Sequence, residues 1–436
     1  MSNKGYKLYK KGKRIIPNGN MLLSKRPENF LPDLWPNYFQ STSGCNVTDL
    51  DGNTYIDVSL MGVGTNILGY SRKEVDESVL KAIKNGVSST LNCPEEVELC
   101  GKLLDMNSWA DMVRLARTGG ELNAIAIRLA RAATGKDKVL ISGYHGWHDW
   151  YLATNILDKS NLNQHHLEGL NPKGVPSALS GTTIPFEHNN LDGFKKLITE
   201  NDDIAAVKME VQRNFEPSMH FLTEVRKICT EKNIVLIFDE CTSGFRETFG
   251  GIFNKFKVFP DIALFSKALG NGYAISACVG KESVMKEAKN TFISSTFWTE
   301  RIGPTAAIST LNLMEQEKSW ELISSQGIKV KTFWKDLFSN HNIDVDISGL
   351  DPLPRFQIKI PHHNKIKTLI TFLMLKRGFL ASDVMYVCTK HDDEILKKYF
   401  YSFEQVIEEI KAVINDEDQF TKYEIEEAYR GFQRLN

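Results

Sequence analysis

Asp239 and Lys267 stand where a protein built on a parallel sheet is expected to carry its chemistry. Asp239 closes the apolar run NIVLIFDE (233–240), and Lys267 follows the apolar run IALFS (262–266). Open α/β sheets bind ligands at the carboxyl ends of their strands. A lysine partly desolvated there has a lowered pKa and is a candidate amine nucleophile. Taken singly, Lys267 is better explained as a surface lysine reaching out from a strand end, and Asp239 equally well as a helix cap or salt-bridge partner.

Two further segments have the residue types to hold an anion and a flat ring. Gly119, Gly120 and Glu121 stand at the start of an expected helix, whose N-terminal amides would face a phosphate. Glycines there let the backbone approach a ligand closely. Tyr144 and His145 follow an expected strand and precede a glycine, so that an aromatic ring could stack on a heterocycle. Each signal is weak alone, because glycine turns and tyrosines at the edge of a core are common.

Together these residues require a ligand that is planar, aromatic and phosphorylated. It must also carry an aldehyde for Lys267 and a basic ring nitrogen for Asp239. Pyridoxal 5′-phosphate (PLP) meets all of these demands. The carboxylate of Asp239 would keep the pyridine nitrogen protonated, so that the ring accepts electrons from a substrate carbanion. The combination therefore predicts an enzyme that transfers amino groups.

The composition favours small-molecule partners. Among 436 residues, 53 Lys and Arg balance 54 Asp and Glu, so charge gives no argument for nucleic acid or an anionic membrane. The seven cysteines are scattered without a C-x-x-C pair, which argues against a disulfide framework or a zinc site and suits a reducing cytosol. We expect no metal. The N-terminus lacks the apolar core of a signal peptide, and no window reaches about eighteen consecutive apolar residues, so a cytoplasmic location is expected.

Strands alternate with helices in the middle of the chain. Apolar strands arranged in this way predict a mostly parallel sheet covered on both faces. The expected strands are residues 112–116, 138–142, 205–211, 233–240 and 262–266, and the expected helices are 73–87, 121–134 and 219–232. Residues 155–182 form a long loop rich in Asn, Gly, His and Pro, and such loops are more often functional than idle.

The two ends of the chain predict a smaller α+β domain. Residues 45–58 read as a hairpin around Asp51-Gly52-Asn53. After residue 305 the pattern predicts helices and short strands, at 305–316, 325–339, 355–360 and 384–388. We expect an N-terminal segment (1–75) that contributes to the small domain and the active site, a large PLP-binding domain (76–305) and a C-terminal small domain (306–436).

These motifs resemble the class III (fold-type I) PLP-dependent aminotransferases, and within them the glutamate-1-semialdehyde 2,1-aminomutase group. The resemblance runs from about residue 15 to 415. It rests on DLDGNTYID (49–57), RTGGELNAIAIRLARAATGKDKV (117–139), YHGWHD (144–149), FDECTSGFR (238–246) and FSKALGNGY (265–273). It implies an α/β fold, that of a fold-type I PLP-dependent transferase, with a mostly parallel seven-stranded sheet in the large domain and a smaller α+β domain.

The resemblance also assigns roles. Lys267 is expected to be the Schiff-base lysine and proton shuttle, and Asp239 the partner of the pyridinium nitrogen. Tyr144 corresponds to the ring-stacking aromatic, and His145 belongs to the same motif. The phosphate-binding turn corresponds to Gly119, Gly120 and Glu121.

Other positions match the family with departures. Thr296, in SSTFWTE, is expected to touch the phosphate of the neighbouring subunit, which implies an obligate homodimer with shared active sites. Glu210 stands where the family has an acid near the coenzyme, although Val211 replaces the usual proline. Cys241 replaces the usual valine under the ring, and a small hydrophobe can fill that place. Leu122 replaces the usual small residue of the phosphate turn.

The reaction is less specified than the coenzyme. Arg26 falls near the N-terminal arginine with which aminomutases bind a small amino acid, and a surface arginine explains it equally well. Residues 155–182 stand where aminomutases have a gating loop, but do not resemble that loop. We expect a transaminase with a ping-pong PLP/PMP cycle, which moves an amino group from an amino acid, glutamate first, to a small or sugar-derived carbonyl compound. The isomerase reaction of glutamate-1-semialdehyde aminomutase, an intramolecular transfer, is the alternative. A catalytically silent PLP-fold binding protein is remote, because Lys267 and Asp239 are both present.

Overall fold

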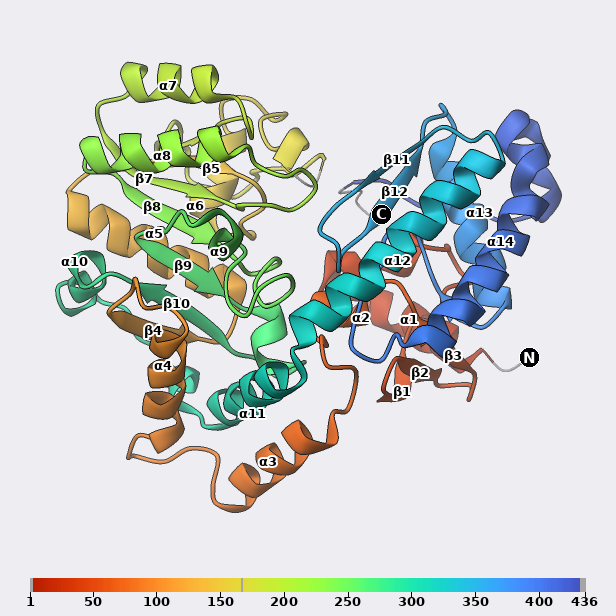
Figure 1. Ribbon diagram of the computed structural model, residues 1–436, viewed down its shortest axis with the longest axis horizontal. Coiled ribbons are helices and arrows are strands. Elements are labelled where there is room, and N and C mark those ends of the chain that lie inside the picture. Colours follow the sequence, from red (N-terminus) through yellow and green to blue (C-terminus); the bar gives the residue numbers. More distant parts are fainter. Residues whose placement is uncertain (1–2, 166–167, 432–436) are drawn as a thin grey trace. The chain divides into compact units, whose positions relative to one another are not determined.

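The computed structural model describes residues 3–165 and 168–431, and the chain divides into two compact units (Figure 1). Unit 1 consists of Met1–Arg72 and Glu321–Asn436, and unit 2 of Lys73–Trp320. The sequence placed the second boundary near residue 305 rather than 320. The segment between belongs to unit 2 because helix α11 (Ile302–Glu317) packs against α3 (Lys73–Lys84) and α4 (Pro94–Asp105).

A seven-stranded sheet forms the centre of unit 2. Strand β10 runs antiparallel to both of its neighbours, and the other neighbouring strands are parallel, so the predicted mostly parallel sheet is confirmed. In spatial order the strands are β4 (Met112–Ala116), β10 (Ser276–Gly280), β9 (Ile262–Phe265), β8 (Val235–Asp239), β7 (Ile204–Met209), β5 (Lys138–Ser142) and β6 (Thr183–Pro185). Strands β6 and β10 were not predicted, since one is three residues long and the other, SACVG, consists of small residues.

Helices cover both faces of this sheet. Helix α5 (Gly119–Thr134) buries an apolar stripe against alternate strand residues, and its members recur at the spacing of one helix face: Leu122, Ile125, Ala126, Leu129 and Ala130. It ends at Gly135, which takes a left-handed conformation (φ 67°). Helix α8 (Met219–Glu231) packs against β8, and Figure 1 shows it with α7 (Leu191–Glu200) on the other side of the sheet. Unit 2 also contains the short α-helices α6 (Asp149–Leu152), α9 (Phe253–Phe256) and α10 (Glu282–Met285).

Unit 1 contains a four-stranded sheet, β1 (Phe39–Ser43), β2 (Asn46–Asp49), β3 (Thr54–Asp57) and β13 (Phe379–Leu380). The predicted hairpin is confirmed, because β2 and β3 are antiparallel and Gly52 takes a left-handed conformation (φ 89°). The helices of this unit are α1 (Lys4–Ile15), α2 (Met61–Gly64), α12 (Ser319–Asn340), whose first two residues fall in unit 2, α13 (His363–Lys376) and α14 (Asp393–Asn415).

The strand predicted at 384–388 does not form. Val384 makes only an isolated bridge to Arg355, while β12 (Arg355–Ile358) pairs with β11 (Val345–Ser348). The segment is buried, but its amides bond to separate pieces of chain: Met385 to the carbonyl of Pro354, Tyr386 to that of Ser59 and Val387 to that of Pro352. The apolar pattern of residues 384–388 therefore predicted their burial correctly, but the predicted strand was wrong.

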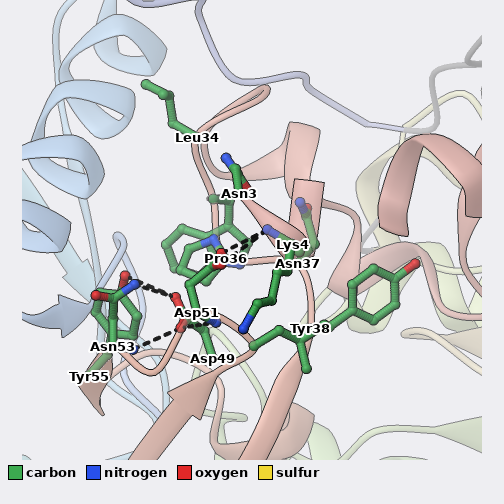
Figure 2. Close-up of a pocket in the computed structure, with 13 residues that line it drawn as sticks. Asn3, Lys4, Leu34, Pro36, Asn37, Tyr38, Asp49, Asp51, Asn53 and Tyr55 are labelled. Atoms are coloured by element: carbon green, nitrogen blue, oxygen red, sulfur yellow. Dashed lines mark hydrogen bonds between the residues drawn. The ribbon is translucent and has the colours of Figure 1, made fainter. Parts of the chain in front are cut away.

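A hollow of about 410 Å³ lies wholly within unit 1, beside the hairpin (Figure 2). Both carboxylate oxygens of Asp51 accept from the backbone amide of Lys4, at 3.1 and 3.0 Å, so the start of α1 is tied to the turn. Its lining contains none of the residues predicted to bind the coenzyme. Within residues 3–165 and 168–431, no helix is long and apolar enough to span a membrane.

Candidate active site

Asp239 is the last residue of β8 and the centre of a buried polar cluster. Its Oδ2 atom lies 2.8 Å from His145 Nδ1 and 2.8 Å from Lys208 Nζ, and Oδ1 accepts from the Cys241 amide at 3.1 Å. The side chains of Asp239, His145 and Lys208 are all almost fully buried, at 2%, 0% and 0% exposure. The sequence identified Asp239 and His145 but missed Lys208. The sequence did contain a signal for Lys208, because a charged residue within the apolar strand β7 needs a buried partner.

The cluster keeps Asp239 ionised. Burial alone would raise the pKa of Asp239, but the charge of Lys208 and the hydrogen bond from His145 outweigh burial and hold this pKa well below its usual value. The pKa of His145 is lowered, first by burial and then by the charge of Lys208. His145 is therefore a neutral imidazole that donates from Nδ1 to the carboxylate. A cationic or protonated ligand nitrogen at this strand end would meet a carboxylate.

Lys267 follows the strand next to that of Asp239, at the same edge of the sheet. Strands β8 and β9 are parallel neighbours, with Asp239 opposite Leu264, and Lys267 opens the short turn that follows β9. Its Nζ donates to Thr242 Oγ1 at 2.6 Å. Lys267 takes a positive φ of 30°, which is uncommon outside glycine and tends to occur at functional sites. Thr242, buried in the loop after β8, is a second residue that the sequence did not single out.

Glu210 positions the segment that carries Tyr144. It follows β7, and its Oε2 accepts from the Tyr144 amide at 2.9 Å while Oε1 accepts from Arg213 Nη1 at 3.1 Å. Gly143 is required beside it, because φ is 111° and a Cβ atom would lie 2.7 Å from Glu210 Oε2. The Tyr144 ring packs edge-to-face on Tyr151, with centroids 6.0 Å apart.

The first turn of α5 is shaped for an anion. Thr118 caps the helix by accepting from the Glu121 amide, and Glu121 Oε2 accepts from the amides of Thr118 (2.9 Å) and Arg117 (3.1 Å). Glu121 is thus a capping residue. In the described chain, no protein acceptor takes the amide hydrogens of Gly119 and Gly120, which lie at the positive end of the helix.

Side chains from other segments close around these glycines. A Cβ atom on Gly120 would lie 3.0 Å from His148 Nε2 and 3.5 Å from Trp147 Nε1. One on Gly119 would lie 3.6 Å from Cys241 Sγ and 3.9 Å from the hydroxyl of Ser266, the residue before Lys267. The glycine turn and the ends of β8 and β9 therefore meet. Leu122 is fully buried and its amide bonds to Thr118 at 3.1 Å, so this departure leaves the helix start regular.

Two further predicted residues, Thr296 and Arg26, belong to other segments of the chain. Thr296 begins a short turn (Thr296–Thr299) and is exposed in the single chain. Arg26 belongs to unit 1 and is 1% exposed. Burial and Glu28 raise the pKa of Tyr9, and the charge of Arg26 partly opposes this rise. No group of three or more His, Cys, Asp or Glu side chains in the described residues could hold a metal ion.

The long loop is packed onto the site. It contains short helical turns at Ala153–Asn155, Asn163–His165 and Ser177–Leu179, and residues 166–167 lie outside the described residues. Leu162 is fully buried in the core beneath α5. The Gly143 amide donates to His165 Nδ1 at 3.1 Å, and burial lowers the pKa of His165 to about 4, so the acceptor nitrogen is unprotonated at neutral pH.

The donor set fits PLP. Two helix-terminal amides and the ring nitrogens of His148 and Trp147 suit a phosphate, the ionised Asp239 suits a protonated pyridine nitrogen, and the amine of Lys267 suits an aldehyde.

Comparisons with known proteins identify the family of this chain. Residues 34–350 match the family model for class III aminotransferases. The chain is 32% identical over 424 residues to the 3-aminobutyryl-CoA aminotransferase of Cloacimonas acidaminovorans (strain Evry), covering 93% of this chain and 97% of that one. It is 30% identical over 436 residues to the glutamate-1-semialdehyde 2,1-aminomutase of Nitrosopumilus maritimus (strain SCM1), covering 94% and 100%.

The fold is shared with solved structures. The FumI protein of Sphingopyxis sp. MTA144, solved in a PLP form, superposes with a TM-score of 0.86 at 21% identity, over 95% of this chain and 98% of that one. The predicted fold-type I architecture is thereby confirmed. The family model and the identity to these relatives show that the chain belongs to the class III aminotransferases, a family of enzymes that use PLP.

Proposed function

We propose that this class III aminotransferase is a cytosolic transaminase that takes an amino group from an amino acid, glutamate first, and gives it to a small or sugar-derived carbonyl compound. The anchoring of loop 155–182 carries the choice of transaminase over aminomutase. An aminomutase must retain its intermediate, whereas a transaminase releases an oxo product in every cycle. Leu162 is buried in the core and His165 is bonded to Gly143, which fits a fixed wall better than a closing lid. The free cysteines support a reducing compartment.

Two of the relatives support the same choice. The relative at 32% identity is named an aminotransferase, and a relative at 28% identity, from Streptomyces kanamyceticus, is named 2′-deamino-2′-hydroxyneamine transaminase. The aminomutase is the second candidate, because relatives at 30% identity carry that name.

The residues of this chain would divide the work as follows. PLP, when bound, supplies a ring that accepts electrons from the substrate carbon. Lys267 would hold the aldehyde carbon, and its amine, once released by the substrate amine, would move a proton at the substrate carbon. Thr242, which accepts a hydrogen bond from Lys267 Nζ at 2.6 Å, orients that amine. Asp239 would hold the ring nitrogen.

Other residues would set the position of the coenzyme. The Gly119 and Gly120 amides, with His148, would hold the phosphate. Tyr144 would stack on the ring, with Cys241 under it and Glu210 fixing the Tyr144 backbone. Arg26 remains a candidate for a substrate carboxylate.

A direct test loads the purified protein with PLP and adds single substrates. Glutamate alone should discharge the visible absorbance of the bound coenzyme in a half-reaction, and an oxo acid or carbonyl acceptor should restore it. The Lys267→Ala variant is the control, and it should show neither change. If glutamate-1-semialdehyde is isomerised without any added partner while glutamate leaves the spectrum unchanged, the transaminase proposal is wrong and the aminomutase is correct.

We further propose a homodimer in which Thr296 reaches the phosphate site of the partner subunit. Phe292 and Phe297 flank Thr296 and are 84% and 73% exposed, and large exposed apolar side chains of this kind mark interaction surfaces. Light scattering should give twice the single-chain mass of 49.4 kDa. Phe297→Asp should shift the protein toward monomers and release PLP on dialysis, whereas Thr296→Ser should do neither. A wild-type monomer that retains PLP would contradict the shared site.

A further inference from the structure

Lys208 is a charged residue in a position that otherwise selects apolar side chains. All six residues of β7 (IAAVKM) are buried, and Lys208 itself is fully buried. A buried ammonium is unfavourable unless it is paired and hydrogen-bonded. Lys208 Nζ meets this need through Asp239 Oδ2 at 2.8 Å. The ion pair with Asp239 therefore explains how the strand tolerates the lysine.

The sheet register points Lys208 to the coenzyme edge. Alternate residues of a strand share a face, so Lys208 lies on the side of Ala206, and Asp239 on the side of Ile237. Ala206 and Ile237 both belong to the core beneath α5. In the pairing of β7 with β8, Lys208 lies opposite Ile237, two residues before Asp239. The ammonium of Lys208 and the carboxylate of Asp239 therefore lie on the same face of the sheet, with Lys208 further from the carboxyl end of the strands.

This contact changes the charge that a ligand meets. Asp239 already has a full cationic partner in Lys208 and a neutral donor in His145. The adjacent Glu210 is likewise paired, with Arg213. The four charged side chains balance before any ligand binds. A protonated pyridine nitrogen would add a second cation to a carboxylate that is already compensated.

We propose that Lys208 is a positioning residue that shares Asp239 with the ring nitrogen of PLP. It stabilises the coenzyme-free site and, through like-charge repulsion, lowers both the affinity for PLP and the proton affinity of the ring nitrogen. The inference rests on the PLP chemistry of the proposed function. Lys208 does not touch the reacting atoms, and it acts through Asp239.

The test compares Lys208→Met with wild type, with and without PLP. Methionine keeps the length of the side chain and removes its charge, so Asp239 retains only His145 until PLP arrives. The Tm of the coenzyme-free variant should fall, and the rise in Tm on adding PLP should be larger than in wild type. Removing a charge near the ring nitrogen of PLP should raise the pKa of that nitrogen by about one unit or more. One pKa unit corresponds to a tenfold change in an equilibrium constant, so the Kd for PLP should decrease by about tenfold or more. With ¹⁵N-labelled PLP, the ring nitrogen should be more fully protonated in the variant.

Lys281→Met is the matched control, because Lys281 Nζ pairs with Asp261 Oδ1 at 2.9 Å, away from the coenzyme residues. It should lower the Tm equally with and without PLP and leave the Kd unchanged. Lys208→Arg keeps the positive charge, so the folded variant should bind PLP with the Kd of the wild type.

Weaker PLP binding by Lys208→Met, with the same Tm loss in both states, would overturn the inference and make Lys208 a purely structural partner. If the variant folds only with PLP, the ¹⁵N measurement on that form decides, and an unchanged ring nitrogen overturns the inference. Failure of wild type itself to bind PLP would instead overturn the proposed function.

Discussion

Lys267→Ala is expected to reduce turnover by about 10³-fold or more, because it removes both the group that holds the coenzyme and the amine that moves the proton. The variant should still bind PLP without a covalent bond, since the phosphate turn, Tyr144 and Asp239 are unchanged. The half-reaction with glutamate, followed by absorbance, measures the rate. Borohydride followed by peptide mapping locates the attachment point.

Lys267→Arg is the matched control, because it keeps a positive charge beside Thr242 but cannot replace the amine. It should be as inactive as the alanine variant, which separates the chemistry of the amine from its charge. Borohydride labelling of another lysine in Lys267→Ala, with turnover preserved, would contradict the assignment.

The places of Asp239 and Lys267 at neighbouring strand ends could be predicted from the sequence, because buried strands have a clear apolar pattern. The runs ending at Asp239 and before Lys267 are almost wholly apolar, and parallel strands bring their carboxyl ends to one edge. The glycine pair at 119–120 indicated the helix start. Thr118 and Glu121 stand at the spacing of a capping box, so the cap was also visible in the local sequence, although it was not predicted.

The other residues of the candidate site could not be predicted, because they depend on contacts between segments that are distant in the sequence. Lys208 was visible as a lysine in an apolar strand, but its partner lies on another strand, 31 residues away. Thr242 accepts a hydrogen bond from Lys267, which lies 25 residues further along the chain, and His148 approaches Gly120 from a different segment. Residues 384–388 show the same limit, since burial is a local pattern and strand pairing is a tertiary one. Arg26 stays a prediction, because it belongs to unit 1 and the residues predicted to bind the coenzyme belong to unit 2.

Asp239→Asn is expected to affect both catalysis and stability. An asparagine cannot hold a protonated ring nitrogen by charge, so the half-reaction rate should fall by at least about 10²-fold. It also leaves Lys208, which is fully buried, without a counter-ion. Breaking a buried pair by removing one partner typically destabilises by about 3–5 kcal/mol. Urea unfolding of the coenzyme-free protein at pH 7 measures this free energy, and single-turnover absorbance measures the rate.

The contribution of Asp239 to stability should depend on pH. The pKa of Asp239 is depressed in the folded state, so its contribution to stability is present above the unfolded pKa of about 3.9 and is lost as the pH falls toward the folded value. The wild-type free energy of unfolding should therefore decrease with acid in this range, and that part of the slope should disappear in Asp239→Asn. Asp261→Asn is the control, because Asp261 also has a lowered pKa and partners in Arg226 and Lys281. It should lose stability and acid dependence but keep its half-reaction rate.

A double variant separates the two consequences of Asp239→Asn. Lys208→Met combined with Asp239→Asn removes both charges of the pair, and replacing a buried ion pair by uncharged groups is often neutral for stability. The free energy of unfolding should therefore recover by about 2 kcal/mol or more relative to Asp239→Asn, a non-additivity expected of residues in direct contact. Turnover should not recover, because the ring nitrogen still lacks its carboxylate. Recovery of both, or of neither, would show that the pairing of Lys208 with Asp239 and the catalytic role of Asp239 are not separate as described.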